Sequence, residues 1–129
     1  MGECKYCNEK YQHSWRTIVE NEHFFANLDN HPVSPGHMKL ISKRHVNSIC
    51  ELTDAEIIAM RDLMAEAQGY ADRKYKPDGY NIGINQGEAA GQTVFHLHVH
   101  MIPRYDGDVA NPIGGVRNII AGMGDYTKQ

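Results

Sequence analysis

Three histidines, His96, His98 and His100, occupy alternate positions of one short run. On a β-strand, alternate side chains point to the same face, so the three imidazoles are expected to line one face of a strand over residues 94–102. The intervening side chains are apolar and are expected to enter the core: Phe95, Leu97, Val99 and Met101. An imidazole can act near neutral pH as a nucleophile, a proton donor or acceptor, or a metal ligand. The pattern predicts a functional site; the alternative is an exposed strand face that is rich in histidine.

Two segments of the chain resemble known motifs. Residues 91–102 (GQTVFHLHVHMI) resemble the signature of the histidine triad family of nucleotide hydrolases and transferases. Residues 28–37 (LDNHPVSPGH) and 43–45 (KRH) resemble the same family, in the expected order and with a helix-length segment between the two blocks. The resemblance covers nearly the whole chain and is to a zinc-containing, bacterial-type branch related to dinucleoside polyphosphate hydrolases. It implies a homodimer.

The resemblance also implies a reaction. His98 would attack the α-phosphorus of a nucleotide, expel the leaving group and form a covalent nucleotidyl-imidazole that water later hydrolyses. His100 would line the phosphate, and His37, expected two strands away, would complete the histidine cluster. Such a nucleophile needs one unprotonated ring nitrogen, which requires the other nitrogen to be held as a donor. For His37 the alternative is an exposed histidine at the start of a strand.

Polar residues around the triad are candidates for substrate binding. Gln92 and Thr93 precede the histidines and are expected to meet charge on the phosphate oxygens. By resemblance, Asn85 binds the α-phosphate or leaving-group oxygen, and Asp29 accepts hydrogen bonds from both ribose hydroxyls. For all four, the alternative is ordinary turn chemistry. Apolar strand residues are candidates either to sandwich the base or to form the core: Phe24, Leu28 and Ile41.

The pair Cys4 and Cys7 has a spacing that fits zinc, although no second such pair follows. The resemblance implies a structural Zn²⁺ held by Cys4, Cys7, His45 and His96, the first histidine of the triad. Four protein ligands leave no position for water, so such a site would be structural. The alternatives are two free thiols or a redox pair. The isolated Cys50 is expected to be a buried thiol.

Length and composition limit the possibilities. The 129 residues suit one domain over residues 1–129, with an irregular C-terminal tail, and the formal net charge of −3 argues against a nucleic-acid partner. A small phosphorylated ligand needs only local cations such as Lys39, Arg104 or Arg117. No apolar run suits a membrane span or a signal peptide, so we expect a cytoplasmic protein with no membrane partner.

The elements expected from the pattern form an α+β fold. Residues 17–20 and 24–28 are expected to form a hairpin, with further strands over 37–42, 80–85 and 94–102. Thr53 and Glu56 form a capping box that begins a long helix, ended by Pro77. Its apolar stripe is Ile57, Met60, Met64, Ala67 and Ala71. These elements predict a mostly antiparallel sheet of about five strands covered on one side by that helix.

The resemblance implies a nucleotide hydrolase or transferase, and within the family the glutamine before the triad and the tail at 114–117 favour dinucleoside polyphosphates as substrates. Three alternatives remain open at this point. One is a nucleoside phosphoramidate hydrolase of the same family, another is a nucleotide-binding regulatory protein with vestigial catalysis, and the third is an enzyme with a catalytic metal held by the three histidines.

Overall fold

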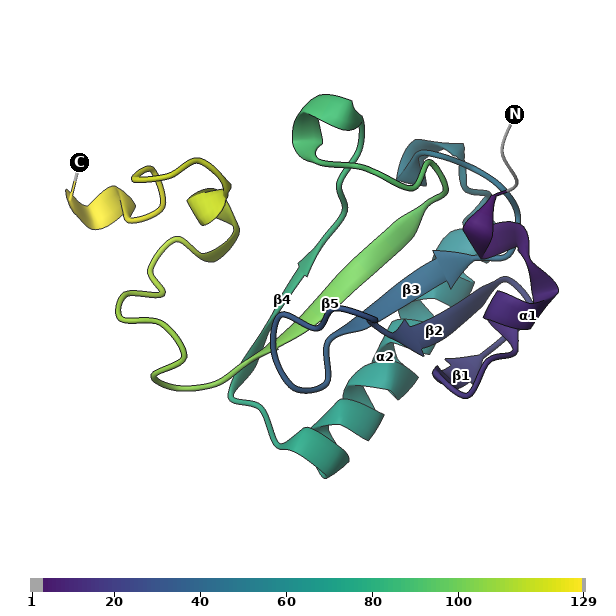
Figure 1. Ribbon diagram of the computed structural model, residues 1–129, viewed down its shortest axis with the longest axis horizontal. Coiled ribbons are helices and arrows are strands. Elements are labelled where there is room, and N and C mark those ends of the chain that lie inside the picture. Colours follow the sequence, from purple (N-terminus) through teal and green to yellow (C-terminus); the bar gives the residue numbers. More distant parts are fainter. Residues whose placement is uncertain (1–3, 129) are drawn as a thin grey trace.

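The structure, a computed structural model, describes residues 4–128 and has a five-stranded sheet with one long helix (Figure 1). The strands are β1 (Thr17–Glu20), β2 (Phe24–Leu28), β3 (Met38–Ser42), β4 (Gly79–Gly83) and β5 (His98–Arg104). The helices are α1 (Glu9–Gln12) and α2 (Asp54–Tyr75), with 3-10 turns at Lys5–Cys7, Ile49–Glu51, Glu88–Ala90, Gly115–Ile119 and Tyr126–Lys128. The strand order is β1-β2-β3-β5-β4, and every neighbouring pair is antiparallel. This confirms the α+β fold.

Helix α2 begins at the expected capping box and covers one face of the sheet. The Thr53 hydroxyl accepts from the Glu56 N–H, and the Glu56 carboxylate accepts from the Thr53 N–H. The helix side of the core contains buried residues from α2, from the strands and from two connecting segments: Phe24, Ala26, Met38, Leu40, Val46, Leu63, Ala67, Ala71, Leu97, Val99 and Met101. The expected stripe was wrong at Ile57, which is 40% exposed. Ile57 lies in the first turn of α2, and Leu63 takes a place in the buried face further along.

The other face of the sheet is covered in part by the N-terminal segment. Tyr6 packs there on Phe25 and Ile41, whose side chains alternate with those that face α2. Figure 1 shows this segment lying across the strands at the β1–β2 end of the sheet, while the β5–β4 end is open on the same face. The histidine site therefore lies on a sheet face that is covered at one end and open at the other.

The histidine strand is shorter than expected. It begins at His98, so His96 is in the preceding bend and does not share a strand face with His98 and His100. The bend follows from the backbone: the N–H of His96 donates to the Val94 carbonyl, and the N–H of Leu97 to the Val46 carbonyl. Leu97, Val99 and Met101 enter the core as expected.

Four smaller expectations were also wrong. Phe95 is 49% exposed, because the bend turns it out of the core. Cys50 is exposed, because it is on the 3-10 turn that precedes α2. Strand β4 ends at Gly83, which leaves Asn85 in the loop that follows. His37 immediately precedes β3, which pairs directly with β5, so His37 is one strand away and not two.

The C-terminal tail extends from the sheet beyond the edge strand β4 (Figure 1). It is irregular, as expected, apart from two 3-10 turns. Among residues 4–128, no helix is both long enough and apolar enough to span a membrane.

Candidate functional site

His98 is placed with one ring nitrogen held and the other free. Its Nδ1 is 2.8 Å from the carbonyl oxygen of His96, and because a carbonyl only accepts, Nδ1 carries the proton and donates. The lone pair is then on Nε2. Burial lowers the pKa of His98; the bond to His96 raises it, and the positive charge of Lys39 lowers it. The ring is therefore neutral at neutral pH, as a nucleophile requires.

His100 is oriented by a hydrogen-bond chain that begins in the backbone. The N–H of Val33 donates to Nδ1 of His37 at 3.0 Å, so the proton of a neutral His37 is on Nε2. That Nε2 is 2.9 Å from Nδ1 of His100 and donates to it. A neutral His100 must then carry its own proton on Nε2. These hydrogen bonds make His100 a donor next to the ring of His98, and the two ring centroids are 5.2 Å apart.

The pKa shifts agree with neutral rings. Burial, with the neighbouring His98 and His37, lowers the pKa of His100 to about 4. Burial likewise lowers the pKa of His37, against the attraction of Asp29. The Asp29 carboxylate is 3.5 Å from His37 Nε2 and 3.9 Å from His100 Nδ1. Burial opposes its charge, yet the His31 N–H and Lys39 keep its pKa below the usual value.

The remaining candidate substrate residues lie in loops. Gln92 is buried, and its amide is used within the protein: Oε1 accepts from the Gly87 N–H, and Nε2 donates to the Asn47 side chain and the Val94 carbonyl. Thr93 and Asn85 are exposed. Of the residues that might sandwich a base, Phe24 and Ile41 are fully buried core residues, and Leu28 packs against the core.

The structure brings the four candidate zinc ligands together from distant parts of the chain. The donor atoms of Cys4, Cys7, His45 and His96 all lie within 4.8 Å of one another. Cys4 Sγ is 3.2 Å from His96 Nδ1, and Cys7 Sγ is 3.1 Å from His45 Nδ1 and 3.5 Å from His96 Nδ1. Tetrahedral Zn²⁺ with bonds of about 2.3 Å to sulfur and 2.0 Å to nitrogen separates such atoms by about 3.5 Å. The donor set therefore fits the metal.

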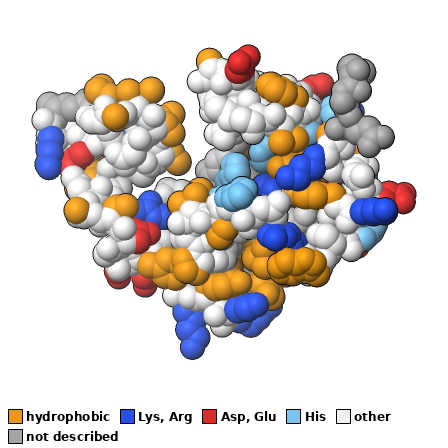
Figure 2. Space-filling model, viewed as in Figure 1, with side chains coloured by type: hydrophobic (Ala, Val, Ile, Leu, Met, Phe, Trp, Pro, Cys, Tyr) orange, Lys and Arg blue, Asp and Glu red, His pale blue; other side chains and the backbone are white. Residues whose placement is uncertain are grey.

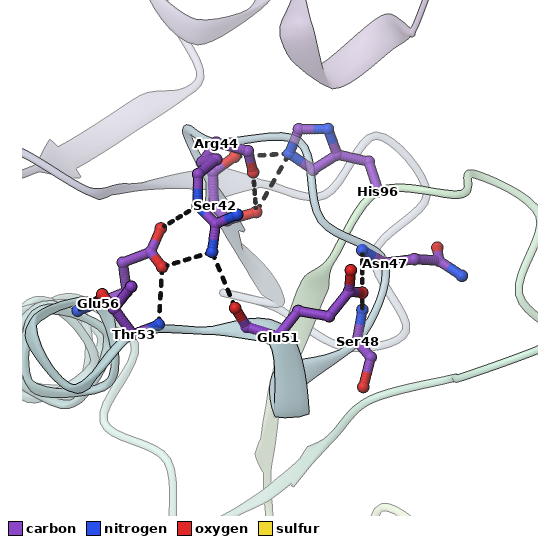
Figure 3. A network of polar contacts seen from close by, with 8 residues as sticks. All are labelled: Ser42, Arg44, Asn47, Ser48, Glu51, Thr53, Glu56 and His96. Atoms are coloured by element: carbon purple, nitrogen blue, oxygen red, sulfur yellow. Dashed lines mark hydrogen bonds and ion pairs between the residues drawn. The ribbon is translucent and has the colours of Figure 1, made fainter.

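The orientation of His96 supports the same conclusion. Its Nε2 is 2.6 Å from the Ser42 carbonyl and donates to it, which leaves the lone pair of Nδ1 directed at the thiols. Metal-ligating histidines commonly donate their second N–H in this way. Figure 3 shows this contact and its continuation: the Ser42 hydroxyl donates to the Arg44 carbonyl, and the Arg44 guanidinium binds Glu56 at the start of α2.

The contacts made by the three candidate cations were not expected from the sequence. Lys39 is buried and donates to the hydroxyls of Tyr6 and Tyr11, an interaction that depends on how the N-terminal segment folds over the sheet. The other two candidate cations are engaged elsewhere, Arg104 with Asp108 and Arg117 with carbonyls of the tail. The available signal for Lys39 was a lysine between the apolar residues of a short strand.

Comparison with known proteins agrees with the geometry. The family model described as "HIT domain" matches residues 10–107. An uncharacterized 16.1 kDa HIT-like protein of Mycoplasma pneumoniae is 39% identical over 89 residues, which cover 69% of this chain and 62% of the relative. A protein of Mycobacterium tuberculosis named AP-4-A phosphorylase is 35% identical over 92 residues, 70% of this chain and 47% of the relative. The chain thus spans less than two thirds of the length of these relatives.

A solved structure is similar as well. A Zn-bound histidine triad family protein from Mycobacterium smegmatis has a TM-score of 0.71 and 33% sequence identity, covering 84% of this chain and 79% of that one. The family match, the fold and the histidine cluster all agree, and the chain therefore belongs to the histidine triad (HIT) family.

Proposed function

We propose that this protein hydrolyses or transfers nucleotide conjugates at the α-phosphorus through a covalent intermediate on His98, with dinucleoside polyphosphates as the favoured substrates. One observation carries the proposal: the His96 carbonyl holds Nδ1 of His98 as a donor, so Nε2 has its lone pair available for attack. The name of the M. tuberculosis relative, AP-4-A phosphorylase, supports the substrate class.

The reaction balances in two displacements. Nε2 of His98 forms a bond to the α-phosphorus, and the bond from phosphorus to the leaving group breaks, its electron pair leaving with a phosphate that needs no proton near neutral pH. Water then attacks the same phosphorus, the P–N bond breaks, and the electron pair returns to Nε2 while the proton of the water passes to solvent. His100 Nε2–H donates to a phosphate oxygen throughout, and His37 keeps that donor in place.

The other site residues have supporting roles in the proposal. Asp29 accepts from the ribose hydroxyls, and Thr93 and Asn85 contact phosphate oxygens from the loops. Gln92 acts by holding its own loop, since its amide binds Gly87, Asn47 and Val94.

Three structural features belong to the same proposal. A structural Zn²⁺ held by Cys4, Cys7, His45 and His96 would tie the N-terminal segment to the sheet. The whole chain acts as one domain in the cytoplasm, where thiols stay reduced. A homodimer forms through the edge of β4 and the tail beyond it, where apolar side chains are exposed: Ile82, Val109, Ile113, Val116, Ile119, Ile120 and Met123.

The decisive experiment is acid quenching of the enzyme during turnover, followed by intact-mass measurement. We expect an acid-labile adduct of one nucleoside monophosphate per chain, and inversion twice at a chiral α-phosphorus, which gives net retention. Direct attack by water would leave no adduct and would invert the configuration. A parallel hydrolysis screen of dinucleoside polyphosphates and nucleoside phosphoramidates identifies the leaving group, because the two classes differ only beyond the α-phosphorus.

A further inference from the structure

A buried polar cluster lies beside the histidine site and is not used by the chemistry above. Lys39 is 5% exposed and Asn27 fully buried, and the two are paired directly across β2 and β3. The Lys39 ammonium donates to Tyr11 Oη at 2.8 Å and to Tyr6 Oη at 3.3 Å. Burial opposes its charge, but the bond to Tyr11, the two phenols and Asp29 raise the pKa of Lys39, so it is a cation at neutral pH.

The hydrogen bonds in this cluster do not balance. A lysine ammonium has three donors, and two have partners among residues 4–128; no carboxylate forms an ion pair with it there. Nδ2 of Asn27 has no partner either. Turning the amide around would let Nδ2 donate to the Thr17 hydroxyl, whose own proton would go to the Gln12 carbonyl, and would place Oδ1 in the position that now lacks a partner.

Unpartnered buried polar groups are costly, and rule-breaking positions of this kind are concentrated at functional or strained sites. The Lys39 ammonium has one N–H without an acceptor. A ligand that completes the cluster would therefore carry hydrogen-bond acceptors. A surface pocket of about 410 Å³ beside Tyr11 is also positively charged. Its cationic lining residues are Lys5, Lys10 and Arg16, and no acidic residue lines it. Figure 2 shows blue cationic side chains close to the pale-blue histidines on this face.

The position of the cluster indicates which part of a nucleotide it meets. Lys39 is opposite His100 in the β3–β5 register, and Asn27 is two residues before Asp29. With the α-phosphorus at His98 and the ribose at Asp29, the base continues away from β5, over β2 and α1. Asn30, next to Asp29, lines the pocket beside Tyr11. The base is thus directed toward the pocket that borders the cluster at Tyr11.

We propose that Lys39, with Asn27 and Tyr11, reads the base and selects a 6-oxopurine, guanine or hypoxanthine, over the 6-aminopurine adenine. This inference rests on the proposed function, which supplies the orientation of the nucleotide. Guanine presents two adjacent acceptors, O6 and N7, and lysine or arginine binding to these atoms is the commonest specific contact to that base. Adenine has an amino group where guanine has O6. An N–H of this group would face the Lys39 N–H, and two donors cannot form a hydrogen bond with each other.

The test is calorimetric binding of GMP, IMP and AMP to the full chain. We expect GMP and IMP to bind with similar affinity, each about tenfold or more tighter than AMP. Lys39→Met keeps the size and buried character of the side chain, and we expect it to weaken GMP and IMP until the preference disappears, with AMP nearly unchanged. Asn27→Leu should reduce the preference and leave the melting temperature unchanged or higher, because it removes an unpartnered polar group. Lys74→Met, on the exposed side of α2, is the control and should change nothing.

Each contrary result is informative. Equal binding of the three nucleotides to the wild type, or a preference for AMP, overturns base selection while the proposed function stands. A Lys39→Met variant that is folded by circular dichroism and weakens all three equally shows a general charge effect and also overturns it. If Lys39→Met keeps the preference for GMP and IMP but has a much lower melting temperature, the cluster is purely structural and base selection is overturned. Failure to bind any nucleotide overturns the proposed function itself.

Discussion

At the scale of single residues, the site depends on where each histidine carries its proton. One backbone carbonyl orients His98, and one backbone N–H, through His37, orients His100. The tautomers follow from these contacts and need no ligand. In the proposed reaction, the site is therefore arranged for attack and for donation before the substrate arrives, which is the condition under which such groups lower a barrier.

Replacing the nucleophile tests this arrangement directly. His98→Ala should lower kcat by at least about 10³-fold, while nucleotide binding and the melting temperature change little, because this side chain acts by forming a bond to phosphorus. Single-turnover kinetics, with calorimetric binding as the control, measures both. Retention of more than a small fraction of the wild-type rate would show that another group attacks.

In the proposed reaction His37 is a positioning residue, and its replacement should have a graded effect. His37→Ala removes the donor that holds Nδ1 of His100, and we expect kcat to fall about 10- to 100-fold, as is typical when a supporting hydrogen bond is lost. His37→Gln retains an N–H donor and should recover part of the loss. Equal activity of the two variants, at either level, would contradict a role through that hydrogen bond.

At the scale of elements, the candidate metal centre connects the N-terminal segment to the loop after β3 and to the bend before β5. Purified protein should contain about one zinc per chain, and Cys7→Ser should release it and lower the free energy of unfolding by about 2–4 kcal/mol, as expected for loss of a cross-link between distant segments. Cys50→Ser is the matched control, because Cys50 is exposed and outside the cluster. Elemental analysis and thermal unfolding measure the two effects. A metal-free wild type of undiminished stability would remove zinc from the proposal.

A second connection between elements joins the end of β3 to the start of α2. Arg44 binds both carboxylate oxygens of Glu56, at 3.0 and 2.8 Å, and Glu56 also caps the helix at Thr53 (Figure 3). The bond from Arg44, with that from the Thr53 N–H, lowers the pKa of Glu56 to about 2. Because the pKa of Glu56 is lower in the folded than in the unfolded protein, its ionised carboxylate stabilises the fold at every pH above the unfolded-state pKa. This contribution is lost as the pH falls toward 2.

Glu56→Gln should therefore be less stable than the wild type by about 1 kcal/mol at pH 7, because the half-exposed Arg44 side chain is partly screened by solvent. The difference should shrink between about pH 4.5 and pH 2 as the wild-type carboxylate is protonated. Urea unfolding across this range measures it, with the exposed Glu66→Gln on the same helix as the control. A difference that does not depend on pH would assign the effect to packing and not to charge.

At the scale of the whole molecule, we expect sedimentation to give twice the chain mass of 14.6 kDa. A chain ending at Asp108 keeps the Arg104–Asp108 pair and the whole sheet, yet loses most of the exposed apolar side chains of the tail. It should fold with a single thermal transition and sediment as a monomer, because in the proposed dimer those side chains are buried against a second copy. A truncated chain that is still dimeric would place the interface elsewhere.

The sequence by itself determined the family and the antiparallel sheet with its long helix, and the family resemblance implied the four candidate zinc ligands. The fold depends on local signals, which are alternation along strands and a capping box at Thr53 and Glu56, and the family depends on motifs at close spacing. Only the tertiary structure decided that His96 leaves the strand, because the bend depends on a hydrogen bond from Leu97 to Val46, about fifty residues away. The buried charge of Lys39 was decided in the same way, because its partners Tyr6 and Tyr11 reach it only when the N-terminal segment folds across the sheet. Contacts between distant residues leave no periodic pattern in the chain, so they appear only once it is folded.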